Sequence, residues 1–464
     1  MPKLVLAPVL AVLSLIAATP APAAPPWSEP ATIATGIPQI GEPSIDFTGS
    51  GRAVLSARLT TQAQGVPSHG FSRLWGQQPD GSFAGRARLV LAAPPVAYGN
   101  SRLALLRLPL AKGDLSIDDL DRPSPTSLGY GLGHCCGALE VDPGGYRRLT
   151  SRAARGGGAI AADGRGDVAA TWVEHLSGRD HLVVAVRRRS QPFGRPSVIA
   201  GSGFISSPSL AWSARGDLVV AYQRSVPRRG PVQRSVEARV RRAGHGWSRV
   251  WRLGPSSGFS VISTAASANG RMVVAWGTQD GGEEAGTPWI VRAAMRAAGA
   301  RGFRTTQRLD VSEGHDERPA GGVTAAMAPD GTATVAWSSI AGARYPHTFP
   351  VRAATARSSL RFGDAQTLAP NAAVGDAAID ARGTALVVWA TLTLPGANQI
   401  SSDVFASLRG PGEAAFAAPE AVGPAERAEL PRAAFDPVTG RPAVVWVSRV
   451  DGIAQRLRFA ARTG

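Results

Sequence analysis

Acidic residues, histidines and one tyrosine in a few short stretches of this 464-residue sequence are the side chains best able to do chemistry. A carboxylate pair can act as general acid and base in glycoside cleavage, and an imidazole can transfer a proton. The members of this set lie in or beside segments that we expect to be long loops, and they match no catalytic motif. We therefore interpret them as ligand-binding candidates and leave the catalytic residues unknown. They are Glu174, His175, His181, Glu283, Glu284, His315, Asp316, Tyr345 and His347.

The two cysteines, Cys135 and Cys136, are adjacent in the sequence. In an oxidising compartment they could pair with each other as a strained vicinal disulfide, which is the interpretation we favour. Two free thiols are the first alternative. A soft metal such as copper, bound with His134, is the second, but no further ligands lie nearby in the sequence. We assign no metal site to them.

Four aspartates, Asp114, Asp118, Asp119 and Asp121, form an acidic cluster a short distance upstream. Oxygen ligands at this density can hold Ca²⁺. Their spacing fits no EF-hand loop, so a solvated acidic loop is the interpretation we prefer, with Ca²⁺ as the alternative. We predict no cofactor.

The elements that would position these residues include six copies of one unit. Each copy has a run of small residues, a glycine turn, an apolar run and an aromatic residue six positions after the glycine. Both runs are too short for helices, and Val, Thr and Trp favour strands, so each copy predicts a β-hairpin. The copies span 161–172, 210–222, 265–276, 324–337, 377–389 and 433–446.

The turn glycine recurs with a near-regular period. Two weaker copies precede the six, at 44–57 and at 95–107, where Ser101 replaces the glycine. A period of about 40–60 residues of short strands is typical of a β-propeller. We predict an all-β propeller of four-stranded blades, with eight blades, or seven plus an insertion as the alternative. The eight turn positions are 51, 101, 166, 216, 270, 331, 383 and 440.

A second pattern, an aromatic residue followed six positions later by an aliphatic one, predicts the fourth strand of each blade. The pattern also occurs upstream of the first hairpin, at Trp27 and Ile33. The C-terminal segment 452–464 has room for a third strand but not for a fourth. We expect residues 27–36 to pair with residues near 455–460, which would close the ring and leave no exposed sheet edge.

Residues 1–24 are predicted to be a signal peptide, with Lys3, an apolar run from Leu4 to Ala18 and an A-x-A sequence at 21–23. Residues 25–464 would then form a single propeller domain, with an insert at about 108–137 in the second repeat. No later run approaches the about 20 apolar residues of a membrane span. We expect a secreted, extracytoplasmic protein with no membrane span after removal of the signal.

The net charge is +16, and Lys3 and Lys112 are the only lysines, so the excess is carried by arginine. Secretion makes nucleic acid an improbable partner. Because guanidinium groups suit carboxylates and phosphates, we expect a monomer that binds an anionic polysaccharide or a cell-envelope component. Five arginines placed in one register of the third strands could form a polyanion-binding ring, although solvated strand ends are the simpler interpretation. These are Arg188, Arg241, Arg296, Arg409 and Arg458.

The small-residue, glycine-turn, apolar-tryptophan pattern resembles secreted bacterial β-propeller repeat proteins, including the sialidase-like families, over about 27–464. The resemblance is to architecture only. The sialidase Asp-box places its glycine three residues before the tryptophan, whereas the gap here is six. The F/Y-R-I-P arginine motif of sialidases is absent.

The long loops between second and third strands, and between blades, would meet on one face, and binding sites are usually carried by such loops. Our first hypothesis is a secreted, non-catalytic binding or scaffold propeller for anionic glycans or cell-envelope polymers. The alternative is a sialidase-like glycan-cleaving enzyme, with Glu174 or the pair Glu283 and Glu284 as its acid and base. The absence of a recognisable catalytic set favours the first.

Overall fold

The structure is a computed structural model that describes residues 26–463 with gaps. Nothing below concerns the structure of the residues in these gaps. The gaps are 38, 48–49, 62–68, 90–126, 134–135, 143–144, 149–153, 164–166, 189–190, 192, 229, 257–259, 280–287, 305, 315–321, 341–347, 358, 394–399, 424–427 and 451–453. The described residues form strands and turns and no helix. This part of the chain therefore contains no helical segment that could span a membrane.

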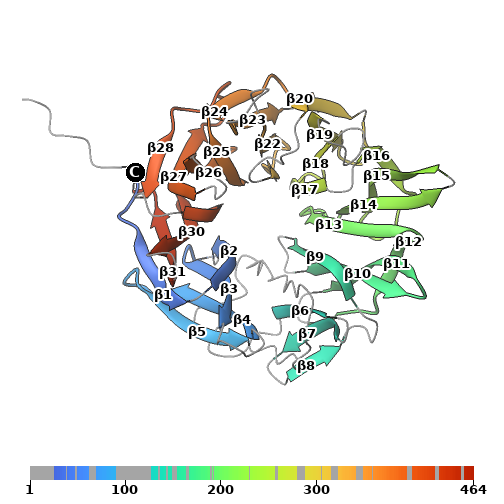
Figure 1. The fold of residues 1–464 in the computed structure, drawn as a ribbon, viewed down its shortest axis with the longest axis horizontal. Helices are drawn as coiled ribbons and strands as arrows, with labels where there is room; N and C mark the ends of the chain where they lie inside the picture. The colour runs from blue at the N-terminus through green and yellow to red at the C-terminus, as the bar shows by residue number, and fades with distance from the viewer. Residues whose placement is uncertain are drawn as a thin grey trace, which may run out of the picture.

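The strands form antiparallel sheets, seven with four strands and one with three. Figure 1 shows these sheets standing around a central axis like the blades of a wheel. The chain is therefore an all-β propeller, as predicted.

The strands follow one another in sequence order across each sheet, apart from the last. The first sheet comprises β2 (Gln39–Phe47), β3 (Ala53–Thr61), β4 (His69–Gln77) and β5 (Phe83–Leu89). The three-stranded sheet comprises β6 (Ser127–Gly133), β7 (Cys136–Asp142) and β8 (Gly145–Arg148). The next sheet comprises β9 (Ala154–Ala162), β10 (Val168–Leu176), β11 (Arg179–Arg187) and β12 (Ser197–Gly201).

The middle of the chain forms three further sheets of the same kind. One comprises β13 (Phe204–Trp212), β14 (Leu218–Arg228), β15 (Gly230–Arg241) and β16 (Trp251–Pro255). Another comprises β17 (Ser260–Ala266), β18 (Met272–Gln279), β19 (Pro288–Arg296) and β20 (Gln307–Gly314). The third comprises β21 (Val323–Met327), β22 (Ala333–Ser338), β23 (Val351–Ala356) and β24 (Gln366–Ala369).

The last two sheets contain the C-terminal strands. One comprises β25 (Ala372–Ile379), β26 (Ala385–Thr393), β27 (Ile400–Arg409) and β28 (Glu420–Gly423). The other combines β29 (Ala428–Phe435), β30 (Pro442–Val450) and β31 (Ala454–Ala461) with β1 (Ala31–Ile37) from the other end of the chain.

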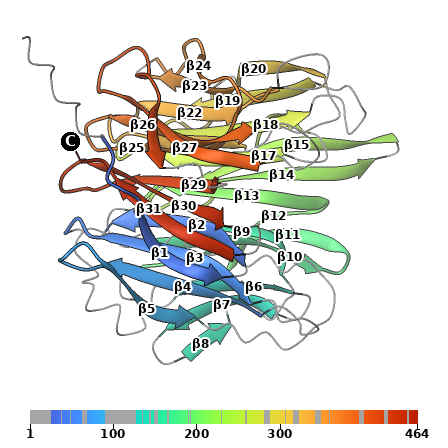
Figure 2. The same cartoon turned by 60° about the vertical axis from the view of Figure 1, so that its left-hand side comes forward.

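The pairing of β1 with β31 places Ala31 opposite Phe459 and Thr32 opposite Arg458. Trp27 extends this pairing by a bridge to Arg462. The N-terminal strand is thus the fourth strand of the last sheet, as the aromatic spacing predicts. In Figure 2, β1 and β31 lie side by side at the left of the molecule.

All six strong hairpins of the sequence pattern are present, as are the weaker copy at 44–57 and the outer hairpin of β7 and β8. The weaker copy at 95–107 lies outside the described residues. Within the expected insert at 108–137, residues 127–137 include β6 and the start of β7, and most of the rest lies outside the described residues, so the insert stays a prediction. The count of eight blades stays a prediction, since residues 90–126 lie outside the described part.

The repeated aromatic residue forms the packing between neighbouring sheets. Trp276 lies in one hydrophobic cluster with Ala221 and Val236 of the preceding sheet, and Trp446 lies in another with Val388 and other residues of its own preceding sheet. Both indoles are at most 1% exposed. The last sheet packs against the first in the same way. The repeated tryptophans therefore belong to the core between sheets.

Candidate functional site

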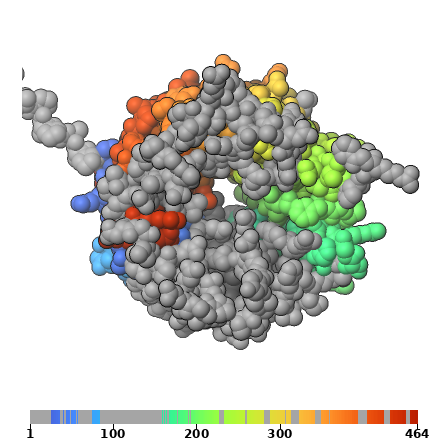
Figure 3. Space-filling model, viewed as in Figure 1, coloured from blue at the N-terminus to red at the C-terminus, as the bar shows by residue number. Residues whose placement is uncertain are grey.

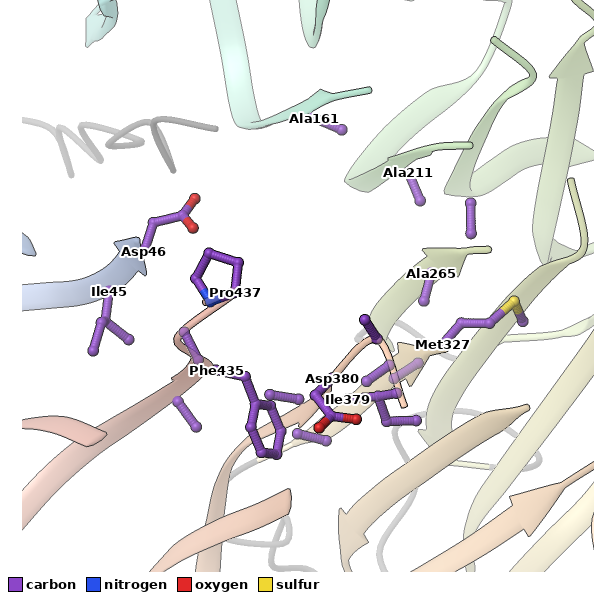
Figure 4. A pocket seen from close by; sticks show the side chains of 18 of the residues that line it. Ile45, Asp46, Ala161, Ala211, Ala265, Met327, Ile379, Asp380, Phe435 and Pro437 are labelled. Carbon is purple, nitrogen blue, oxygen red and sulfur yellow. The ribbon is translucent and has the colours of Figure 1, made fainter. Parts of the chain in front are cut away.

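A cavity of about 600 Å³ lies on the axis of the wheel. Its wall comes from the innermost strands of seven sheets: β2, β9, β13, β17, β21, β25 and β29. Alanines dominate this wall, among them Ala161, Ala211 and Ala265, whose methyl groups come from three different sheets (Figure 4). Because these side chains are small, the wheel is hollow at its centre, which Figure 3 shows from outside.

The cavity opens among the turns that join first and second strands. Asp380, Arg382, Asp436 and Val438, all from such turns, line its mouth. The mouth is therefore on the face of the short turns, opposite the face of the long loops where the sequence led us to look. Most of the long loops lie outside the described residues, so the candidates expected there are not placed.

The carboxylates at this mouth are used inside their own turns. Asp380 Oδ1 accepts hydrogen bonds from the backbone N–H groups of Arg382 (2.9 Å) and Thr384 (2.7 Å). Asp436 accepts from the Val438 N–H (2.9 Å) and from the Thr439 hydroxyl (2.6 Å). Such bonds are typical of aspartate in tight turns. These two acids shape the rim, so they are poorly placed for acid–base chemistry.

Arginines flank the same turns and form what we call the arginine collar, defined by Arg52, Arg215, Arg271, Arg382 and Arg441. Three of them, Arg215, Arg382 and Arg441, are exposed. Each collar arginine is directly next to a turn glycine in the sequence. This recurring pair of arginine and glycine is the sequence signal that could have identified the collar.

Three of the collar arginines lie against the turn glycine of the next sheet. The Arg215 Cδ lies 3.5 Å from where a Cβ on Gly270 of the next sheet would be, and Arg271 lies directly against Gly331 of the sheet after that. Arg382 lies near Gly440 in the same sense. Gly270, Gly331 and Gly440 thus leave room for the arginine of the preceding sheet.

Two aromatic side chains, Trp212 and Phe435, also line the cavity. The Trp212 Nε1 is buried and has no hydrogen-bond partner in the described part of the chain. An apolar wall, two aromatic rings and charged groups at the mouth suit binding of an extended ligand better than its chemical conversion.

Of the predicted site residues, Glu174, His175 and His181 lie together at one hairpin, but they do not lie in a long loop. Glu174 and His175 are in β10, His181 is in β11, and only Ser177 and Gly178 connect the two strands. Both connecting residues have positive φ (51° and 76°), as in a tight two-residue turn. The expectation of a long loop at this point is therefore wrong.

Contacts within the fold occupy two of these side chains. Glu174 is 3% exposed, and its Oε1 accepts a hydrogen bond from the Trp172 Nε1 (3.0 Å). His175 Nδ1 lies 2.7 Å from Asp180 Oδ1, and Asp180 Oδ2 accepts from the Ile205 N–H of the next sheet (3.0 Å). His181 is half-buried beside Gly201. Glu174 is too enclosed for the acid–base role of the enzyme hypothesis.

The remaining ligand-binding candidates lie in three gaps of the description. Cys135 also lies in a gap, so the disulfide, thiol and copper alternatives stay open, and Cys136 begins β7. The acidic cluster at 114–121 is likewise outside the described residues. The candidates in the gaps are Glu283, Glu284, His315, Asp316, Tyr345 and His347.

The register expected for the third-strand arginines is partly wrong. Strand pairing puts Arg187, not Arg188, in line with Arg241, Arg296 and Arg409. In the last sheet, Arg458 pairs with Trp446, four residues short of this position. Arg188 is exposed just after β11, and Arg458 donates to the Thr32 hydroxyl (2.8 Å).

The burial of two of these arginines also argues against an exposed, polyanion-binding ring of arginines. Arg296 and Arg409 are at most 1% exposed, and each donates to a backbone carbonyl four residues on, Ala300 (2.9 Å) and Glu413 (3.1 Å). Desolvation lowers the pKa of both guanidinium groups from the ordinary value. Arg409 also lies over the Phe416 ring. These two arginines hold the outer turns in place.

Tyr222 occupies the tryptophan position of its hairpin and is fully buried. Burial, and then the nearby Glu237 carboxylate, raise the pKa of its hydroxyl far above the ordinary value. A buried neutral phenol is unsuited to act as a nucleophile. Within the described ranges, no group of three His, Cys, Asp or Glu residues could hold a metal ion.

No family model matches this chain, and no curated protein matches it. Solved structures with a similar fold include an α-L-arabinanase of Penicillium chrysogenum complexed with arabinobiose, at 11% identity and a TM-score of 0.41, covering 94% of this chain and 98% of that one. The NanB sialidase of Streptococcus pneumoniae is 7% identical with a TM-score of 0.38, covering 95% and 93%. A Dyadobacter fermentans protein of unknown function is 11% identical with a TM-score of 0.38, covering 66% and 93%.

Proposed function

We propose that this protein is an exported, non-catalytic binding propeller that takes an extended anionic polymer, such as an acidic glycan or a cell-envelope polymer, on its short-turn face. The observation that carries the proposal is the make-up of the central cavity: an alanine wall whose mouth carboxylates Asp380 and Asp436 are used as turn caps.

The charge distribution supports an anionic ligand. The chain has a formal charge of +16, and the collar places guanidinium groups around the mouth of the cavity. A polymer segment that packs on the alanine wall would bring its carboxylate, sulfate or phosphate groups within reach of the collar. Guanidinium groups bind such planar or tetrahedral oxyanions with paired hydrogen bonds.

Binding to polygalacturonate, with neutral dextran as the comparison, tests this proposal by titration calorimetry. We expect binding to the acidic polymer only, weakening as salt rises from 50 to 300 mM because exposed charges are screened. Arg382→Gln should weaken binding several-fold, and Ala265→Phe, which fills part of the cavity, about tenfold. Arg179→Gln, an exposed arginine on the opposite face, is the matched control and should leave affinity unchanged.

Two outcomes would overturn the proposal. One is equal affinity for dextran and polygalacturonate in variants and wild type alike. The other is cleavage of the polymer that is abolished by Asp380→Asn or by Asp46→Asn, at a further carboxylate of the cavity lining, which would establish the glycan-cleaving alternative instead.

A further inference from the structure

A second cavity, of about 480 Å³, lies between two neighbouring sheets at the outer part of the short-turn face. The turn joining β15 to β16 forms one side, and the turn joining β19 to β20 forms the other. Four arginines, Arg242, Arg249, Arg296 and Arg301, contribute to its lining, and no acidic residue does. We call this cavity the arginine pocket.

The deepest of these arginines is incompletely partnered. Arg296 is 0% exposed; its Nε donates to the Ala300 carbonyl, and its Nη1 donates to Asp217 Oδ2 (3.3 Å) and to the Gly270 carbonyl (3.2 Å). Its Nη2 is buried and has no hydrogen-bond partner in the described part of the chain. Leaving a buried charged donor without an acceptor costs about 1–3 kcal/mol or more, so a ligand that supplies the acceptor is favoured.

A second unused donor belongs to the same pocket. The Nε1 of Trp251 is buried and, among described residues, has no acceptor. The indole ring lies against the Arg249 guanidinium, 4.4 Å from the ring centroid, and against Gly302 of the neighbouring sheet. These two contacts hold the ring in the pocket lining.

The charges around the pocket are unbalanced. The Asp217 carboxylate pairs with Arg296, and its Oδ1 also accepts the Ala243 N–H (3.0 Å). Arg242, Arg249 and Arg301 are exposed at the pocket edge, and no described ion pair engages them. The pocket thus has four guanidinium groups and one nearby carboxylate, which favours an anionic ligand.

We propose that the arginine pocket binds a phosphate or sulfate group, with Arg296 Nη2 and Trp251 Nε1 as its deep donors and Arg249 and Arg301 as its outer cations. A tetrahedral oxyanion offers three or more acceptor oxygens to donors that converge from different directions. A carboxylate offers two oxygens in one plane and a single charge, so it matches this arrangement less well. The volume leaves room for a small organic group attached to the oxyanion.

Titration calorimetry of the full chain tests this site. The two titrants are sodium sulfate and inorganic phosphate, at constant ionic strength. We expect saturable binding of both anions and much weaker binding of acetate. Arg249→Gln and Arg301→Gln should each weaken binding about tenfold, the loss of one charge-assisted hydrogen bond. Trp251→Phe, which keeps the ring and removes the donor, should weaken it several-fold.

Arg304→Gln is the matched control, because Arg304 is exposed in the same turn as Arg301 but does not line the pocket. Equal affinity in Arg301→Gln and Arg304→Gln, or acetate binding as tight as sulfate, would overturn the proposal. Comparing sulfate with phosphate shows which of the two oxyanions the pocket prefers.

The arginine pocket is separate from the central cavity, so each of the two proposals can be contradicted without the other. Ala265→Phe should leave the affinity for sulfate unchanged. Arg301→Gln should still allow polygalacturonate to bind in the central cavity. Loss of sulfate binding in Ala265→Phe would place the anion in the central cavity and contradict the arginine pocket.

Discussion

At the scale of single residues, two groups of arginines have different roles in this chain. Arg296 and Arg409 are buried and hold the turns that follow their strands. The collar arginines and those at the edge of the arginine pocket lie at the surface of the short turns. A single count of basic residues hides this division, because both groups contribute equally to the net charge.

The buried ion pair of Arg296 with Asp217 gives a stability prediction. Asp217→Ala should lower the free energy of unfolding by about 3 kcal/mol or more, because it leaves a buried guanidinium without its carboxylate. It also removes the acceptor of the Ala243 N–H. Urea denaturation followed by tryptophan fluorescence measures the change.

Asp364→Ala is the control for this measurement, since Asp364 is an exposed aspartate in an outer turn. Its cost should stay within about 0.5 kcal/mol. If Asp217→Ala costs no more than Asp364→Ala, the ion pair contributes nothing to the fold.

At the scale of elements, the glycine of each inner hairpin adopts a backbone conformation that other residues rarely adopt. Its φ lies between 74° and 92° at the described positions 51, 216, 270, 331, 383 and 440. At some of these positions it also makes room for a side chain of the preceding sheet, and at others it does not. Gly331 has Arg271 against it, whereas Gly383 has nothing within 4 Å of an added Cβ.

Gly331→Ala and Gly383→Ala therefore form a matched pair. Both should lose about 1 kcal/mol of stability because alanine is strained at φ near 90°. Gly331→Ala should lose more, because Arg271 must also move. Thermal unfolding of the two variants measures the difference, and a larger loss in Gly383→Ala would contradict the role we give to Arg271.

The hairpins were predictable from sequence because a turn glycine and an aromatic residue six positions later recur in each unit. Trp27 marked the closing strand for the same reason. The arginine register was not predictable, because loops of different length separate second and third strands. Counting along the chain therefore chose Arg188 and Arg458, whereas strand pairing puts Arg187 in line with the others.

The cavities were less predictable than the hairpins. Small residues in the innermost strands were visible in the sequence, but that they line an open cavity became clear only from the arrangement of seven sheets. The arginine pocket joins Arg249 and Arg301, which are far apart in sequence and belong to neighbouring sheets. No local pattern brings such residues together.

At the scale of the whole molecule, the wheel depends on pairing between the two ends of the chain. Trp27 is 3% exposed and donates through Nε1 to Glu420 Oε2 (3.0 Å), while Glu420 also pairs with Arg462 (2.9 Å). These contacts tie the N-terminal segment to the last two sheets. The β14–β15 hairpin, by contrast, extends beyond its neighbours at the right of Figure 2 and contributes little to this closure.

A chain that starts at Gln39, and so lacks β1, tests how much the closure contributes. We expect a lower melting temperature and concentration-dependent association, because the outer edge of β31 becomes available for pairing. Hydrogen exchange should show lost protection in residues 454–461. Peptides from β17 to β20 are the internal control, and unchanged protection of β31 would contradict the role of β1.

The union of first and last strands in one sheet also bears on how the protein is made. Because the chain is made from its N-terminus, β1 appears first and stays without its partner strand until β31 has been made. During this interval the unpaired strand of one chain can pair with the finished tail of another. Two molecules that exchange their leading strands in this way would each be complete, so a low chain density favours single wheels over interlocked pairs.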